Sequence, residues 1–105
     1  MEKMVNLIDV FGSNILTRNS IKLFFDVLKK SKNKNFEINF SDIEFISRSC
    51  ADEYLKLKET SKKKLVESNM SDSVYNMFLN IKRQYESADI NFDFVISHEK
   101  GILLQ

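Results

Sequence analysis

The sequence predicts a small α/β domain, with about four mostly parallel strands and three helices mainly on one face of the sheet. Segments rich in β-forming residues alternate with amphipathic helical segments along the chain. Strands that alternate with helices in this way are joined by right-handed crossovers into a mostly parallel sheet. The 105 residues, 43% of them hydrophobic, correspond in length and composition to one domain with one core.

The first segments of the chain predict a strand followed by a helix. Val5–Phe11 is rich in β-forming residues, and Gly12–Asn14 interrupts it. Thr17 is the expected N-cap of the helix that follows. The apolar residues of that helix recur at helical spacing and share one face: Ile21, Phe24, Phe25 and Leu28. We expect this face to belong to the core.

The segment Phe36–Phe40 alternates strictly between apolar and polar residues, which is typical of a strand with one covered face. This alternation is the reason to expect the helices mainly on one side of the sheet. The apolar positions change from even to odd numbers between Phe40 and Ile43. Because side chains alternate with a period of two, this change predicts a bulge or bend at Ser41 and Asp42.

The second half of the chain predicts two more helices and two more strands. A helix is expected over Cys50–Lys62 with Ser49 as its N-cap, and Leu65 and Val66 predict a short strand. Ser71 is the expected cap of the third helix. The apolar face of that helix contains Val74, Met77, Phe78, Ile81 and Tyr85. Phe92–Ile96 predicts the last strand, with a tail from about residue 99.

Composition narrows the classes of partner. Sixteen Lys and Arg residues against fifteen Asp and Glu residues give a net charge of +1, so a nucleic acid is not an expected partner. No apolar run long enough to span a bilayer occurs, so a membrane is not expected either. The single cysteine, Cys50, excludes an internal disulfide and fits a reducing compartment. We therefore expect a cytoplasmic protein.

One stretch resembles a known family. Phe45–Glu53 (FISRSCADE) resembles the STAS-like family of unknown function, which is related to the STAS domains of anti-sigma factor antagonists. Asn14–Leu28 and Ser71–Ile81 are similar to the first and third helical segments of that family. The resemblance covers about 90 residues, and Phe45–Glu53 is its most specific part.

The resemblance places the switch loop of the antagonists at residues 47–50. In the antagonists this loop reads Asp-Ser-Ser-Gly, and a histidine-kinase-like ATPase phosphorylates its first serine. Ser47 falls on the aspartate, Arg48 on the phosphorylated serine, Ser49 on the second serine and Cys50 on the glycine. Arg48 cannot accept a phosphoryl group, so the family's switch does not transfer directly. Ser49 is the remaining candidate for phosphorylation.

The resemblance implies a non-enzymatic protein-interaction module of a signalling or regulatory partner switch. The implied partner is a histidine-kinase-like ATPase or a regulator that such an ATPase controls. The candidate partner-binding residues surround the predicted strand–loop–helix connection: Asp42, Ser47, Arg48, Ser49, Asp52 and Glu53. A helix cap at Ser49 and a solvated Arg48 are the structural alternative for the same loop.

Two other functions stay open. The first is a small-molecule or anion receptor, in which Arg48 and the following helix N-terminus would bind the ligand. The second is a nucleic-acid-associated protein that uses the lysines between positions 56 and 64, namely Lys56, Lys58, Lys62, Lys63 and Lys64. No cofactor, metal site or catalytic residue is predicted, because His98 is the only histidine and Asp42 and Glu44 have no matching acidic cluster.

Overall fold

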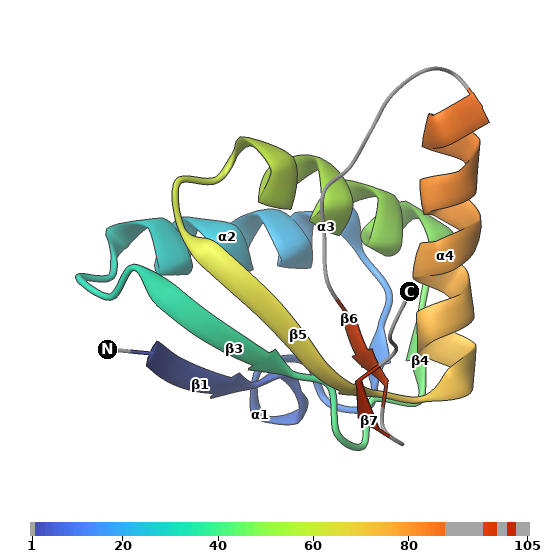
Figure 1. Ribbon diagram of the computed structural model, residues 1–105. Coiled ribbons are helices and arrows are strands. Elements are labelled where there is room, and N and C mark those ends of the chain that lie inside the picture. Colours follow the sequence, from blue (N-terminus) through green and yellow to red (C-terminus); the bar gives the residue numbers. More distant parts are fainter. Residues whose placement is uncertain (1, 88–95, 99–100, 103–105) are drawn as a thin grey trace.

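The protein is an α/β domain, as predicted from the sequence (Figure 1). The computed structural model describes residues 2–87, 96–98 and 101–102. A five-stranded sheet has the order β1-β3-β5-β6-β7, in which all neighbours except β6 and β7 are parallel. Its strands are β1 (Glu2–Asn6), β3 (Asn35–Asn39), β5 (Lys64–Met70), β6 (Ile96–His98) and β7 (Gly101–Ile102).

A separate parallel pair extends the predicted strand set. β2 (Asn14–Ile15) pairs with β4 (Phe45–Ile46) outside the main sheet. Asp42 lies at φ 67° in the turn between β3 and β4, so the predicted bend at this point is confirmed. This turn carries the chain out of the main sheet and into the β2–β4 pair.

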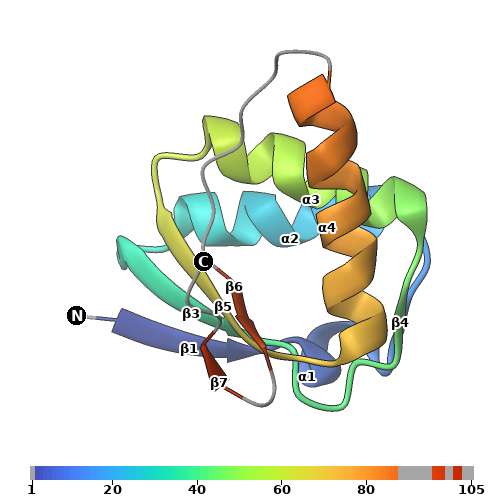
Figure 2. The same cartoon turned by 45° about the vertical axis from the view of Figure 1, so that its right-hand side comes forward.

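The helices of the crossovers lie on the same side of the sheet (Figures 1 and 2). These helices are α2 (Arg18–Lys30), α3 (Arg48–Thr60) and α4 (Asp72–Ser87). From β1 to β6, successive strands are added in one direction across the sheet. Right-handed crossovers in one direction place every helix on one face. The prediction of helices mainly on one face, made from the alternation of one strand, is therefore confirmed.

The core lies between this face and the helices. Phe36 and Ile38 of β3 point into it and are 1% and 0% exposed, while Glu37 on the other face is half-buried. The predicted helical faces are confirmed: Ile21, Phe24, Phe25, Leu28, Val74, Phe78 and Ile81 are buried, and Met77 and Tyr85 are partly buried and pack against the core. Edge-to-face contacts join several of these rings, including Tyr54 to Phe78 at 5.4 Å between centroids.

Three elements differ in their bounds from the sequence prediction. The predicted strand Val5–Phe11 is wrong from Leu7 onward, because β1 ends at Asn6 and residues 7–11 form the short helix α1 (Leu7–Phe11). Helix α3 begins at Arg48 rather than Cys50 and ends at Thr60 rather than Lys62. The two-residue strand predicted at Leu65 is the seven-residue β5.

The end of the chain is described only in part. Of the predicted strand Phe92–Ile96, only Ile96 lies within the described residues, and it begins β6. Two residues of the predicted tail, Gly101 and Ile102, form β7. Among the described residues, none of the helices has both the length and the apolar character that a membrane span requires.

Candidate functional site

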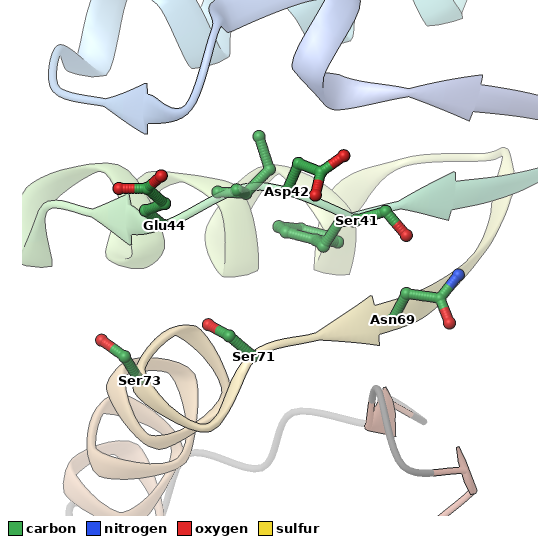
Figure 3. A pocket seen from close by; sticks show the side chains of 8 residues that line it. Ser41, Asp42, Glu44, Asn69, Ser71 and Ser73 are labelled. Carbon is green, nitrogen blue, oxygen red and sulfur yellow. The ribbon is translucent and has the colours of Figure 1, made fainter.

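An open pocket of about 580 Å³ lies at the carboxyl ends of β3 and β5 (Figure 3). In parallel α/β sheets this edge is the usual position of ligands. Buried Phe40 and Ile43 contribute its apolar lining. Its polar lining comes from the β3–β4 turn and from the β5–α4 junction, which face each other across the pocket: Ser41, Asp42, Glu44, Asn69, Ser71 and Ser73.

Asparagine side chains join the strand ends beside this pocket. Asn39 Nδ2 donates to Asn6 Oδ1 at 2.8 Å, and Asn69 Nδ2 donates to Asn39 Oδ1 at 2.9 Å. Asn69 and Asp42 have φ values of 58° and 67°, a backbone region that Asn and Asp tolerate better than most residues. The ends of β1, β3 and β5 are therefore tied together, and the pocket has a defined wall.

The charge of the pocket selects its ligands. Asp42 and Glu44 are its charged lining residues, and both are exposed. Among the described residues no cation lines the pocket, so its two carboxylates favour a neutral polar or cationic group and disfavour an anion. The sequence identified Asp42 as a candidate, but it missed Asn69, Ser71 and Ser73 because these come from a different part of the chain. The only sequence signal for them was the cap at Ser71, which is confirmed, since Val74 N donates to Ser71 Oγ at 3.2 Å.

Ser47, not Ser49, is the N-cap of α3. The Cys50 backbone N–H donates to Ser47 Oγ at 3.2 Å, and the Ser47 N–H donates to the Ile15 carbonyl at 2.9 Å. This second bond keeps Ser47 extended at the end of the β2–β4 pair, so the first helical residue is Arg48. Ser49 lies inside the first turn, half-buried, with its hydroxyl 3.3 Å from that of Ser47. The predicted cap at Ser49 is therefore wrong.

The two serines should differ in their effect on stability. We expect Ser47→Ala to lower the free energy of unfolding by about 1 kcal/mol, because the Cys50 N–H loses its acceptor. Ser49→Ala should change it by less than about 0.5 kcal/mol. Urea denaturation of both variants measures the difference. An equal loss in the two variants would contradict the assignment of the cap.

Arg48 is exposed but has a partner. Its guanidinium donates to Oε1 of Gln84 on α4. The sequence placed Arg48 in a free loop, and the structure instead places it in the first turn of α3 beside a neighbouring helix. A partner that binds Arg48 would have to compete with an exposed amide, which is a weak competitor for a guanidinium.

Asp52 and Glu53 are held by an arginine that the sequence did not single out. Arg18 Nη1, at the start of α2, lies 3.2 Å from Asp52 Oδ2 and 2.8 Å from Glu53 Oε1. The hydrogen bond with Glu53 is the main reason that the pKa of Arg18 is raised. Lys56 also pairs with Asp52 at 3.1 Å. These carboxylates therefore join α2 to α3, whereas Asp42, in the turn between β3 and β4, makes no hydrogen bond or ion pair with them among the described residues.

Two large apolar side chains are exposed beside the start of α3. Ile15 and Ile46 of the β2–β4 pair point inward and are 1% and 2% exposed. Their neighbours point outward, so that Leu16 is 61% and Phe45 43% exposed. Ser47 Oγ donates to the Leu16 carbonyl at 3.4 Å, which places Leu16 directly beside the cap. We call this region the Phe45 surface; it consists of Leu16, Phe45, Ser47, Arg48 and Ser49.

The lysines between positions 56 and 64 do not form one free face. Lys58 Nζ lies 2.7 Å from Glu67 Oε1 in the interior, and Lys63 Nζ donates to the carbonyls of Ser31 and Asn33 at 2.7 Å each. With Lys56 paired to Asp52, three of the five lysines have partners within the protein. Lys62 and Lys64 remain exposed.

The remaining candidates from the sequence are the single cysteine and a possible metal site. Cys50 is a free thiol and is fully buried. Among the described residues, no group of three or more His, Cys, Asp and Glu side chains is placed to hold a metal ion. Comparison of the chain with protein-family models, curated proteins and solved structures finds no match.

Proposed function

We propose that the protein is a non-enzymatic protein-interaction module of a signalling or regulatory partner switch, and that the Phe45 surface contacts the partner. The observation that carries the proposal is the exposure of Leu16 and Phe45 beside an exposed arginine at the start of α3. Adjacent exposed apolar side chains mark protein contacts, and aromatic residues and arginine are enriched there. Neither side chain is needed to fill the core.

The STAS-like resemblance supports the same surface, since its switch loop falls on residues 47–50. On this basis the partner is a histidine-kinase-like ATPase, or a regulator that such an ATPase controls, in the cytoplasm. Arg48 would bind a carboxylate or phosphate of the partner, while Leu16 and Phe45 would supply apolar contact. Ser49 would be the site of regulation: a phosphate there adds negative charge to the first turn of α3 and beside Arg48, and it would change the contact.

Variants of this surface test the proposal by affinity capture from the native host. We expect the wild type to capture one discrete protein, and Leu16→Ser/Phe45→Ser to bind it at least about tenfold more weakly. Leu23→Ser/Val27→Ser is the matched control, because Leu23 and Val27 are 57% and 67% exposed on α2. Arg48→Glu should also weaken capture, while Gln84→Ala, which frees Arg48, should not.

Two results would contradict the proposal. One is capture that survives in both Leu16→Ser/Phe45→Ser and Arg48→Glu. The other is equal weakening in Leu16→Ser/Phe45→Ser and in the control on α2, which would indicate a general effect of removing exposed apolar side chains.

A small-molecule receptor is the second candidate function, and the pocket of about 580 Å³ favours it. The pocket replaces the Ser47–Ser49 loop as the expected position of the ligand. Because Asp42 and Glu44 line it, a neutral polar or cationic ligand replaces the anion. Such a ligand would raise the melting temperature of the isolated protein by mass action, an effect that a protein-interaction module does not require.

A further inference from the structure

One end of the molecule is strongly basic, although the net charge of the whole chain is only +1. Six exposed lysines lie in the last turn of α2, in the α2–β3 and α3–β5 connections and at the first residue of β5. These two connections lie side by side in both views of the protein (Figures 1 and 2). We call this region the lysine end; it consists of Lys29, Lys30, Lys32, Lys34, Lys62 and Lys64.

The topology brings these lysines together. Each crossover helix returns the chain to the amino ends of the strands, so consecutive helix–strand connections become neighbours when their strands pair. β3 and β5 pair with Asn35 opposite Lys64, and the Lys64 N–H donates to the Lys34 carbonyl at 2.8 Å. The Lys63 ammonium, bonded to two carbonyls of the α2–β3 connection, also joins the two connections. The backbone that carries the exposed lysines is therefore fixed.

Six exposed lysines outnumber the acidic side chains near them in the described part of the chain: Asp26 lies four residues before Lys30 on α2, and Glu59 lies three residues before Lys62. The ion pairs of lysines in that part of the chain involve Lys56, Lys58 and Lys82, and none includes a residue of the lysine end. The acidic residues Asp42 and Glu44 lie at the opposite, carboxyl edge of the sheet. The lysine end therefore carries a local positive potential that the overall charge of +1 does not indicate.

Exposed aliphatic side chains adjoin these charges. Leu23 and Val27 are four residues apart on α2 and so lie along one side of the helix. They are 57% and 67% exposed, and Lys30 follows Val27 by three residues. Exposed aliphatic groups next to lysines are typical of surfaces that rest on a lipid headgroup layer.

We propose that the lysine end and the adjacent Leu23–Val27 side of α2 dock on the surface of an anionic lipid bilayer. Surface docking needs no membrane-spanning segment, so the proposal departs from the sequence-based expectation of no membrane partner, which rested on the absence of such a segment. The six ammonium groups contact the headgroups, and Leu23 and Val27 enter the boundary between headgroups and acyl chains. Each lysine near such a surface raises the partition coefficient about fivefold, equivalent to about 1 kcal/mol. This surface is separate from the Phe45 surface, and either proposal can hold without the other.

An acidic protein surface and a nucleic acid fit these residues less well than an anionic bilayer does. Lysine is depleted at protein–protein interfaces, and exposed ion pairs between proteins contribute little to affinity. Nucleic-acid sites commonly add arginines that bind phosphate or bases in a planar fork, or aromatic side chains that stack on bases. The lysine end contains neither residue type, whereas an aliphatic pair suits lipid.

Flotation with vesicles tests the proposal. The wild type should bind vesicles of phosphatidylcholine mixed with phosphatidylglycerol, should not bind phosphatidylcholine alone, and should dissociate as salt is raised. Lys32→Gln/Lys34→Gln should lower the partition coefficient about 25-fold, from two lysines at about fivefold each. The matched control is Lys22→Gln/Arg83→Gln, which removes the same charge from exposed positions outside the lysine end and should leave binding nearly unchanged.

Further variants separate the parts of the proposal. Leu23→Ser/Val27→Ser should weaken vesicle binding without changing its dependence on salt, and unchanged binding would overturn the role of the aliphatic pair. Equal losses in the two charge variants would overturn the role of the lysine end. Binding to a DNA duplex as strong as to the anionic vesicles, lost in Lys32→Gln/Lys34→Gln, would overturn the membrane in favour of a nucleic acid. Circular dichroism melts establish that every variant is folded.

Discussion

Replacement of Glu67 by leucine is expected to lower the free energy of unfolding by about 3 kcal/mol. Glu67 points from β5 into the core and is 1% exposed. Its carboxylate accepts a hydrogen bond from the Tyr54 hydroxyl at 2.6 Å and pairs with Lys58 at 2.7 Å. The leucine would leave the buried Tyr54 hydroxyl without this acceptor and the nearly buried Lys58 ammonium without this counter-charge. Urea denaturation measures the loss.

Two comparison variants make this prediction specific. Glu59→Leu, on an exposed position of the same helix as Tyr54, should change stability by less than about 0.5 kcal/mol. Tyr54→Phe/Lys58→Met/Glu67→Leu should recover much of the loss, because an apolar replacement removes all three polar groups together. Wild-type stability in Glu67→Leu would show that the three groups do not act as one buried network.

The carboxyl group of Glu67 should also make the free energy of unfolding depend on pH. Burial raises the pKa of Glu67 above its usual 4.5, and the neighbouring Lys58 only partly opposes this. Between 4.5 and the raised pKa the folded state therefore binds more protons than the unfolded state. The free energy of unfolding of the wild type, relative to Glu67→Gln, should fall as pH rises through this window.

Replacement of Phe78 by alanine is expected to lower the free energy of unfolding by about 3 to 5 kcal/mol. Phe78 of α4 is 0% exposed, and its ring makes edge-to-face contacts with Phe40 at 5.9 Å and with Tyr54 at 5.4 Å. These contacts join a helix, the end of β3 and α3, so the cavity cannot close by moving one side chain. Phe45→Ala should cost less than about 1 kcal/mol, since that ring is 43% exposed.

The pair of phenylalanine variants also bears on function. A small loss of stability in Phe45→Ala would mean that Phe45 is available for contact without a structural role. A loss as large as that of Phe78→Ala would instead assign Phe45 to the core and would remove the main support for the Phe45 surface. Thermal and urea denaturation of the two purified variants, side by side, distinguish these outcomes.

Much of the fold could be predicted because apolar periodicity reports burial directly. The face of α2, the strand at Phe36 and the cap at Ser71 all follow from local patterns that tertiary contacts do not oppose. The start of α3 was missed for a tertiary reason. Two serines near the helix start were equivalent as local caps, and the bond from Ser47 to Ile15 in another segment decided between them.

The candidate site was less predictable because it depends on contacts between distant segments. Asp42 and Asn69 line one pocket only because β3 and β5 are neighbours. The exposure of Leu16 and Phe45 follows from the two-residue pair β2–β4, which is too short to produce an alternating pattern. Likewise, the lysines of separate segments gather at one end of the molecule only because two helix–strand connections become neighbours when β3 and β5 pair.

Site-specific photo-crosslinking in the native host tests whether the Phe45 surface contacts a protein partner. A benzophenone amino acid is placed at position 45 in one protein and at position 27, the most exposed apolar position on α2, in another. We predict one discrete protein adduct from position 45, identified by mass spectrometry as the protein that affinity capture recovers, and no such adduct from position 27. Absence of an adduct at position 45, or the same adduct from both positions, would show that the Phe45 surface is not the specific contact with the partner.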